Sequence, residues 1–246
     1  MEPPAKLMMR KAIVLAAGRG TRMGDLTEEK PKPMLLVGDA PMLEHIVRRL
    51  QAAGIEEILL VVGYRRELVE AHFRSFPGIS FVVQEIVDGT ASAIRLGRSF
   101  IGDANFILTF GDIITPAENY AGIGADLETS GAFAVAGVKW VDDPWRGAAV
   151  YADATGRVSA IIEKPPLGTS TTNWNSAGLY AFRAEIFQEI ETIPRSSRGE
   201  YEIASAVEQF ITKDHLVRMF EMQGAWRDVG RPEDLAAAPG ELLASE

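Results

Sequence analysis

Residues 12–33 limit the fold and the chemistry of this chain more than any other stretch. A short apolar run over residues 12–15 has the pattern of a buried β-strand and leads into a glycine-rich, basic loop. The glycines are Gly18, Gly20 and Gly24, and the basic residues are Arg19, Arg22 and Lys32. Glycine lets a backbone come close to a ligand, and successive main-chain N–H groups in such a loop form a concavity that suits phosphate oxygens. The stretch therefore predicts a polyphosphate site at the end of the first strand.

This loop matches neither of two common phosphate-binding patterns. No Gly-Lys-Ser/Thr follows, as a P-loop requires, and Met23 stands where Gly-x-Gly-x-x-Gly needs its third glycine. A dinucleotide-binding oxidoreductase is disfavoured because Pro31 and Pro33 follow where that fold needs a helix. Since a proline restricts the residue before it to extended geometry, we expect Lys32 to be extended and held in place. The simpler alternative is a surface loop with scattered charges.

Composition excludes several classes of protein. The chain has 246 residues and a formal net charge of −9 at pH 7, whereas general nucleic-acid binding requires a basic surface. It contains no cysteine and three histidines, which excludes disulfides and thiolate sites and argues against a histidine metal cluster. No apolar run approaches the ~20 residues of a membrane span, and the N-terminus lacks a signal-peptide core. We expect a cytoplasmic protein without nucleic-acid or membrane partners, and a homo-oligomer is compatible with the sequence.

The first half of the chain alternates strand and helix patterns. Apolar runs over residues 58–62, 79–83 and 105–110 predict buried strands. Amphipathic patterns after residue 41 and over residues 66–73 predict helices. This rhythm predicts a parallel sheet covered by helices. Ligands of such sheets bind beyond the carboxyl ends of the strands, which is where the glycine-rich loop lies.

Two polar positions follow predicted strands in this half. Gln84 ends one strand, and its amide offers a donor and an acceptor to the edge of a base. Gly89-Thr90 begins a helix whose first N–H groups we expect to be free. The alternative is that these residues only cap a strand and a helix. Asp112 follows another strand, where a carboxylate suits a hard cation such as Mg²⁺, although it could also cap a helix.

The second half has a different character. Residues 146–151 and 157–162 have the pattern of a β-hairpin. Glu163-Lys164 comes directly after that hairpin and before two prolines. On an open loop, an ion pair between such residues ordinarily contributes little to stability. Asp228 precedes Val229-Gly230, which also suits a simple turn. Further strands are expected over residues 132–138, 175–182 and 215–220, with helices over residues 186–190 and from about residue 198.

Several motifs together resemble one enzyme family. Leu-Ala-Ala-Gly-x-Gly-Thr-Arg at residues 15–22, followed by Pro-Lys-Pro-Met, resembles the signature of the sugar-1-phosphate nucleotidylyltransferases, also called nucleotide-sugar pyrophosphorylases. Gly-Asp at 111–112, Glu-Lys-Pro at 163–165 and the closing segment from residue 224 are similar to motifs of that family, so the resemblance runs from Arg10 to about Leu235. The chain departs from the family at two places. Asp25 stands where proline is usual, and Ser176 replaces an asparagine, with Asn175 one residue early.

The resemblance implies a role for each site residue. The catalytic residues would be Arg22, Lys32 and Asp112, with the first two on the triphosphate. The nucleotide would be bound by Leu15, Ala16, Ala17, Gly18, Gly20, Thr21, Gln84, Gly89 and Thr90. The sugar phosphate would be bound by Gly147, Glu163, Lys164, Asn175 and Ser176. The cofactor would be Mg²⁺, held by Asp112 and Asp228.

The resemblance also implies a fold. This is a Rossmann-like three-layer α/β/α fold with a mostly parallel mixed sheet, of the nucleotide-diphospho-sugar transferase type. We expect one domain over residues 10–238, with a nucleotide-binding half to about residue 115 and a sugar-binding half beyond it, and tails at residues 1–9 and 239–246. Because no hexapeptide repeat follows, we expect the short form of the family, without a left-handed β-helix domain.

The activity that the resemblance implies is transfer of a nucleoside monophosphate from a nucleoside triphosphate, dTTP or UTP above others, to a sugar 1-phosphate. The products would be a nucleotide sugar and pyrophosphate. Two alternatives stay open. One is a GTP-dependent mannose- or heptose-1-phosphate guanylyltransferase, and the other is a non-catalytic relative that binds nucleotide sugars in a regulatory role.

Overall fold

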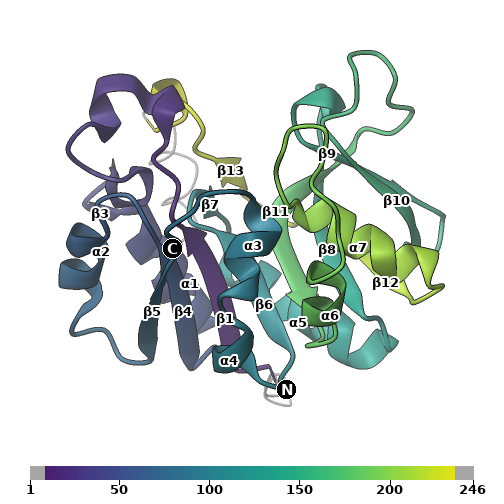
Figure 1. Cartoon of the computed structure of the whole chain (residues 1–246), viewed down its shortest axis with the longest axis horizontal. Helices are drawn as coiled ribbons and strands as arrows, with labels where there is room; N and C mark the ends of the chain where they lie inside the picture. The colour runs from purple at the N-terminus through teal and green to yellow at the C-terminus, as the bar shows by residue number, and fades with distance from the viewer. Residues whose placement is uncertain (1–8, 236–246) are drawn as a thin grey trace.

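The computed structural model describes residues 9–235, and within that range nine strands form one mixed sheet (Figure 1). The strand order is β10-β9-β11-β6-β1-β4-β5, and β8 joins β11 to β12. These strands are β1 (Lys11–Ala16), β4 (Glu57–Val62), β5 (Ile79–Val83), β6 (Phe106–Phe110), β8 (Ala134–Trp140), β9 (Ala148–Ala152), β10 (Val158–Glu163), β11 (Trp174–Phe182) and β12 (Val217–Glu221). Two small ribbons lie apart from it, β2 (Leu36–Val37) with β3 (Ala40–Pro41) and β7 (Ile113–Ile114) with β13 (Arg227–Asp228).

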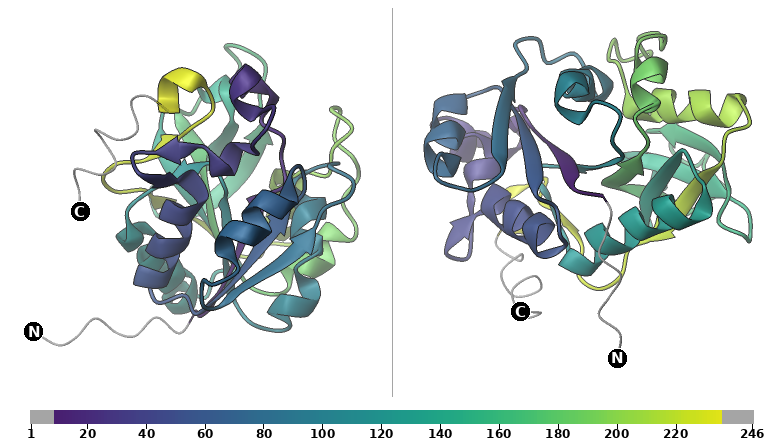
Figure 2. Two further views of the ribbon diagram at one scale, coloured as in Figure 1. Left: turned by 90° about the vertical axis from the view of Figure 1, so that its left-hand side faces the viewer. Right: turned by 90° about the horizontal axis from the view of Figure 1, so that it is seen from below.

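Helices cover both faces of this sheet (Figure 2). The α-helices are α1 (Met42–Ala52), α2 (Arg66–Phe73), α3 (Thr90–Arg95), α4 (Arg98–Ile101), α5 (Ala117–Ser130), α6 (Ile186–Ile190) and α7 (Ile203–Thr212). Short 3₁₀ turns lie at Thr21–Thr27, Lys32–Met34 and Pro144–Arg146. One hydrophobic core joins α1, α2 and α5 to one face, and a second joins α3, α6 and α7 to the other. The three-layer architecture expected from the sequence is confirmed.

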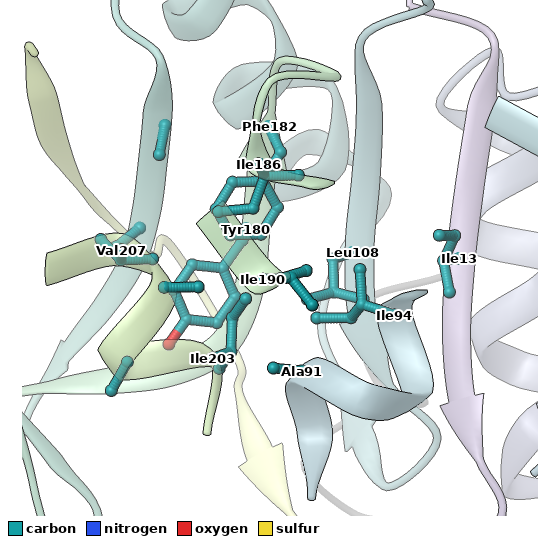
Figure 3. Packing of buried hydrophobic residues seen from close by; sticks show 14 of the residues in the cluster. Ile13, Ala91, Ile94, Leu108, Tyr180, Phe182, Ile186, Ile190, Ile203 and Val207 are labelled. Carbon is teal, nitrogen blue, oxygen red and sulfur yellow. The ribbon is translucent and has the colours of Figure 1, made fainter. Parts of the chain in front are cut away.

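The central strand shows why the sheet must be buried on both sides. Alternate residues of a strand point to opposite faces. In β1, Val14 joins the core under α1 and α5, whereas Ile13 joins the core under α3 and α6. Figure 3 shows Ile13, Leu108 and Ile94 in that second core. Because β1 pairs in parallel with β4 and β6, the carboxyl ends of all three strands lie at the same edge, and the loops after them can form one site.

Strand β11 links the two halves of the chain. Its last four residues pair with β6 of the nucleotide-side sheet, whereas Asn175 pairs with β9 and most of its length pairs with β8. The register shifts between Ser176 and Tyr180. Within this irregularity Gly178 has a φ of 71°, and a Cβ there would lie 2.8 Å from the Ile113 side chain, so only glycine fits. The bulge is typical of a strand next to a functional site.

Several boundaries differ from those expected. The strand expected over residues 132–138 is β8 at 134–140, and the helix expected from about residue 198 begins at Ile203. Met9, expected in the N-terminal tail, is only 2% exposed and packs in the core. The rest of that tail, the C-terminal tail and the domain end at residue 238 fall outside the described residues, and the division near residue 115 stays a prediction. Between residues 9 and 235, no helix combines the length and apolar character of a membrane span.

Candidate active site

The glycine-rich loop forms one wall of a pocket of about 300 Å³, which we call the first pocket. It lies beyond the carboxyl ends of β1 and β6, as the parallel topology requires. The structure brings together eleven of the twelve residues expected to be catalytic or to bind the nucleotide, and Thr21 is the one that does not line the pocket. They are Leu15, Ala16, Ala17, Gly18, Gly20, Arg22, Lys32, Gln84, Gly89, Thr90 and Asp112.

Lys32 is the most constrained basic residue of the first pocket. Its side chain is 9% exposed, and its Nζ lies 2.5 Å from Oδ2 of Asp112. Our expectation of extended geometry was wrong, because Lys32 begins a 3₁₀ turn closed by hydrogen bonds from Met34 N to Pro31 O and from Leu35 N to Lys32 O. Gly20 makes room for it, since a Cβ at Gly20 would lie 2.6 Å from the Lys32 Cβ. Backbone contacts therefore outweigh the local preference of a residue before proline.

Asp112 and Asp228 lie close together although they are far apart in sequence. The ribbon of β7 and β13 pairs Ile113 with Asp228, and Val229 N donates to Asp112 O at 3.1 Å. Loss of surrounding water and then the charge of Asp112 raise the pKa of Asp228 to about 6. Asp228 keeps part of its surface open to solvent, and the like charge of Asp112 beside it disfavours a second negative charge. The alternative that Asp112 caps a helix is wrong, because a strand follows it.

These two carboxylates fit a divalent cation in part. Among the described residues, no group of three or more histidine, aspartate or glutamate side chains could hold a metal alone. Mg²⁺ is commonly bound by one or two carboxylates, with substrate phosphates and water completing its octahedron. A pair whose mutual repulsion raises a pKa gains from a cation between its members. Asp112 and Asp228 could therefore hold Mg²⁺ once a phosphate supplied further oxygens.

At the other end of the first pocket, the orientation of the Gln84 amide can be deduced. Gly89 O accepts a hydrogen bond from Ser92 Oγ at 2.8 Å and also faces the Gln84 amide at 3.3 Å. A carbonyl oxygen only accepts, so the Gln84 atom facing it must be Nε2, which also donates to Ser92 Oγ at 3.2 Å. The amide oxygen, Oε1, is then the group that remains for a ligand. Gln84 itself is 6% exposed.

The N-terminus of α3 differs from the expectation of free N–H groups. Ala91 N donates to Tyr201 O at 2.9 Å, and Thr90 Oγ1 accepts a hydrogen bond from Ile203 N at 3.0 Å. A Cβ at Gly89 would lie 2.2 Å from Tyr201 O. Gly89 and Thr90 thus line the first pocket and also hold the segment that precedes α7. Sequence spacing could not show this, because the partner lies more than 100 residues away.

A second pocket of about 750 Å³ adjoins the first. It contains all five residues expected on the sugar phosphate, namely Gly147, Glu163, Lys164, Asn175 and Ser176, and also Asp228. Four residues line both pockets, namely Arg22, Thr90, Phe110 and Glu200. Because Arg22 lines both, its guanidinium can reach a phosphate group bound where the two pockets meet.

Asn175 and Ser176 have different roles in this wall. Asn175 Nδ2 donates to Pro144 O at 2.7 Å, and a Cβ at Gly147 would lie 2.1 Å from its Oδ1. Residue 147 must therefore be glycine because the Asn175 carboxamide packs against it. This requirement does not depend on a bound ligand. Ser176 Oγ instead lies 2.5 Å from the hydroxyl of Tyr180, a buried residue whose pKa is raised to about 12, chiefly by burial. The position at which the family usually has asparagine thus carries Ser176, whose hydroxyl is hydrogen-bonded to the hydroxyl of Tyr180.

The second pocket contains an arginine-carboxylate cluster that was not predicted from the sequence. Arg198 Nη1 lies 3.0 Å from Glu202 and 3.4 Å from Glu163, and its Nη2 lies 3.4 Å from Glu200. Burial, and then the charge of Glu202, raise the pKa of Glu163. The spacing of Arg198 and Glu202 suggested only a helix start, and it is the folding of β10 against α7 that gives them Glu163 as a neighbour.

Lys164 has a strained backbone at the mouth of the second pocket. Its φ is 44°, in the left-handed region that costs a non-glycine residue roughly 1–2 kcal/mol. Its N–H donates to Gly147 O at 2.9 Å, so the strand end fixes this conformation and turns the side chain into the pocket wall. Strain of this kind is often found at ligand-binding positions.

The positive φ of Lys164 predicts that glycine is more stable than alanine at this position, which reverses the usual order. We expect Lys164→Gly to be more stable than Lys164→Ala by about 1 kcal/mol, because glycine relieves the positive φ. Denaturant unfolding of both variants measures the difference. At Lys213, where φ is −86°, the matched pair should show the ordinary order, with alanine at least as stable as glycine. Equal stabilities for the two Lys164 variants would show that the backbone relaxes there.

Comparison with known proteins agrees with this site. The profile of the family described as "Nucleotidyl transferase" matches residues 11–245. The chain is 36% identical over 231 residues to the UTP–glucose-1-phosphate uridylyltransferase AglF of Haloferax volcanii, covering 91% of this chain and 93% of AglF. It is 33% identical over 232 residues to the bifunctional protein GlmU of Methanococcus aeolicus, covering 94% of this chain but only 54% of GlmU. The chain thus spans about half the length of the GlmU relatives that it matches.

Solved structures give the same fold. A UDP-glucose pyrophosphorylase complexed with UDP-glucose superposes with a TM-score of 0.88 at 21% identity, covering 97% of this chain and all of the other. A putative glucose-1-phosphate thymidylyltransferase from Bacillus anthracis superposes with a TM-score of 0.84 at 26% identity, covering 94% of each chain. With a family profile over nearly its whole length and a relative of matching length at 36% identity, this chain belongs to the nucleotidyl transferase family.

Proposed function

We propose that this protein transfers a nucleoside monophosphate from UTP or dTTP to a sugar 1-phosphate, and that it releases pyrophosphate. The observation that carries the proposal is the shared wall of the two pockets, where Arg22 and Thr90 face both. One phosphorylated substrate in each pocket would bring two phosphates together at this wall. The names of AglF and of the two superposed structures support the same reaction class.

The proposed reaction needs positioning and charge neutralisation rather than a covalent intermediate. An oxygen of the sugar 1-phosphate attacks the α-phosphorus of the nucleotide, the bond from that phosphorus to the bridging oxygen breaks, and pyrophosphate leaves with the electron pair. Arg22 and Lys32 would bind the triphosphate and stabilise the leaving group, and Lys164 would hold the sugar phosphate. Mg²⁺ held by Asp112 and Asp228 would neutralise charge on the α-phosphate.

The Gln84 amide supports the choice of base. Its Nε2 is occupied by Gly89 O and Ser92 Oγ, so Oε1 remains as an acceptor at the base end of the first pocket. Uracil and thymine present a ring N–H at N3, whereas the corresponding ring nitrogens of cytosine and adenine only accept. We therefore expect UTP and dTTP to be better substrates than CTP and ATP.

A cytoplasmic location, homo-oligomer formation and the lack of nucleic-acid or membrane partners remain predictions from the sequence.

The proposal is tested by pyrophosphate release with Mg²⁺, over a grid of four nucleoside triphosphates and six sugar 1-phosphates. We expect turnover with UTP or dTTP and one or a few sugars, and none without sugar. Turnover confined to GTP would overturn the assignment of the base but keep the reaction. A grid without turnover, in which a nucleotide sugar still raises the melting temperature, would favour a non-catalytic binding protein.

A further inference from the structure

One segment joins the two pockets. Residues 195–203, which we call the strap, end at the first residue of α7 and contribute residues to the second pocket. One hydrogen bond attaches the strap to the loop after β5, from Tyr201 N to Asp88 O at 2.8 Å. Two more attach it to the start of α3, from Ala91 N to Tyr201 O at 2.9 Å and from Ile203 N to Thr90 Oγ1 at 3.0 Å. The loop carries Gln84 and Gly89 of the first pocket, so it lies between that pocket and the strap.

At its other side the strap carries the cluster of the second pocket. Arg198 and Glu202 belong to it, and Arg198 reaches Glu163 at the end of β10. Ala91 of α3 and Ile203 of α7 belong to the same hydrophobic core as Tyr180 (Figure 3). The strap thus spans from the base end of one pocket to the charged wall of the other.

Arg195 secures this connection from outside both pockets. Its Nη2 lies 3.3 Å from Oδ2 of Asp88, and its Nη1 donates to Gly199 O at 2.8 Å. Its guanidinium lies 4.8 Å from the centre of the Tyr201 ring. The Asp88 side chain is 19% exposed but that of Arg195 is 52% exposed. The ion pair alone is therefore a surface pair of small energy, and Arg195 holds the strap through its three contacts together. Arg195 lines neither pocket.

We propose that Arg195 is a positioning residue that makes nucleotide binding and sugar 1-phosphate binding depend on each other. A nucleotide that fixes the loop of Gln84 and Gly89 would fix Asp88, and through Arg195 the strap, so that Arg198 is already placed when the sugar phosphate enters. The coupling is reciprocal, because each ligand pays part of the cost of ordering the same segment. This inference rests on the proposed function.

The test is calorimetric binding of the sugar 1-phosphate that supports turnover, with and without saturating α,β-methylene-UTP. In the wild-type protein we expect the nucleotide analogue to tighten sugar phosphate binding at least about fivefold. In Arg195→Met this factor should fall to at most about half of its wild-type value, because only the hydrogen bonds of Tyr201 and Ile203 still join the strap to the loop and α3. The affinity for each ligand alone should change less than about threefold. If Arg195→Met only damaged the fold, each ligand alone would bind more weakly and the coupling factor would stay unchanged.

Two controls separate the outcomes. Arg183 lies 4.9 Å from the ring centre of Phe133, away from both pockets, so Arg183→Met loses a similar contact and should keep the wild-type factor. Asp88→Asn should act like Arg195→Met, and the double variant should go no further. A coupling factor that is unchanged in Arg195→Met, or near one in the wild type, overturns the inference while the proposed function stands. If no sugar phosphate supports turnover, both fail together.

Discussion

Replacing Asp112 by asparagine is expected to lower kcat by at least about a thousandfold and to leave the protein folded. Several parts of the proposed mechanism involve Asp112. It pairs with Lys32 at 2.5 Å, it affects the charge of Asp228, and it lines the first pocket beside Gly111. Asparagine keeps the shape and one acceptor oxygen but removes the charge that Lys32 and a cation would share. Steady-state pyrophosphate release measures the loss of kcat.

The stability of this variant needs its own measurement. Lys32 is 9% exposed and forms an ion pair with Asp112, so Asp112→Asn weakens a charged hydrogen bond and should cost about 1–3 kcal/mol in the free energy of unfolding. Asp126 of α5 provides a matched control, because it pairs with Arg218 at 2.8 Å, is 18% exposed at its side chain and lines neither pocket. Asp126→Asn should lower stability to a comparable extent and leave kcat unchanged. A near-normal kcat in folded Asp112→Asn would show that our assignment of its role is wrong.

The parts of the site that could be predicted from sequence are those set by local chain geometry. The glycine-rich loop follows a strand that is apolar on both faces. Gln84 comes directly after β5, and Asp112 lies two residues after the buried strand β6. Our expectation that residues 79–83 form a buried strand was wrong, because β5 lies at the edge of the sheet and none of its residues is fully buried. The common location of the loop, Gln84 and Asp112 then follows from the parallel sheet alone, because the carboxyl ends of neighbouring strands lie at one edge. No long-range contact had to be known to place these residues together.

The parts that could not be predicted depend on contacts across the sheet. Arg198 acquires Glu163 only when β10 packs against α7, and Thr90 meets Ile203 across 113 residues. Gly147 looked like a site for close approach of a ligand, but its constraint comes from Asn175 on the neighbouring strand. In each of these cases the missing information is a partner that sequence spacing does not identify. The error at Lys32 has a different origin, since the backbone hydrogen bonds of its own 3₁₀ turn outweigh the preference of a residue before proline.

In the first loop, replacement by alanine should destabilise the protein much more at Gly20 than at Gly18. Gly20 has a φ of 74°, and a Cβ there would lie 2.6 Å from the Lys32 Cβ. Strain in the left-handed region and the forced displacement of Lys32 together should cost about 2–4 kcal/mol in the free energy of unfolding. Since Lys32 must move, we also expect kcat/KM to fall at least about a hundredfold. Denaturant unfolding and steady-state kinetics measure the two effects.

Gly18 is the matched control within the same motif. A Cβ at Gly18 would meet nothing within 4 Å, and its φ lies outside the left-handed region, so Gly18→Ala should keep its free energy of unfolding within about 0.5 kcal/mol. Gly18 nevertheless lines the first pocket. Any loss of nucleotide affinity in this variant therefore comes from a methyl group in the space that phosphate should occupy, and not from a damaged fold. Full nucleotide affinity in Gly18→Ala would exclude close approach of the ligand at this glycine, whereas an ordinary stability in Gly20→Ala would show that Lys32 is not held by the loop.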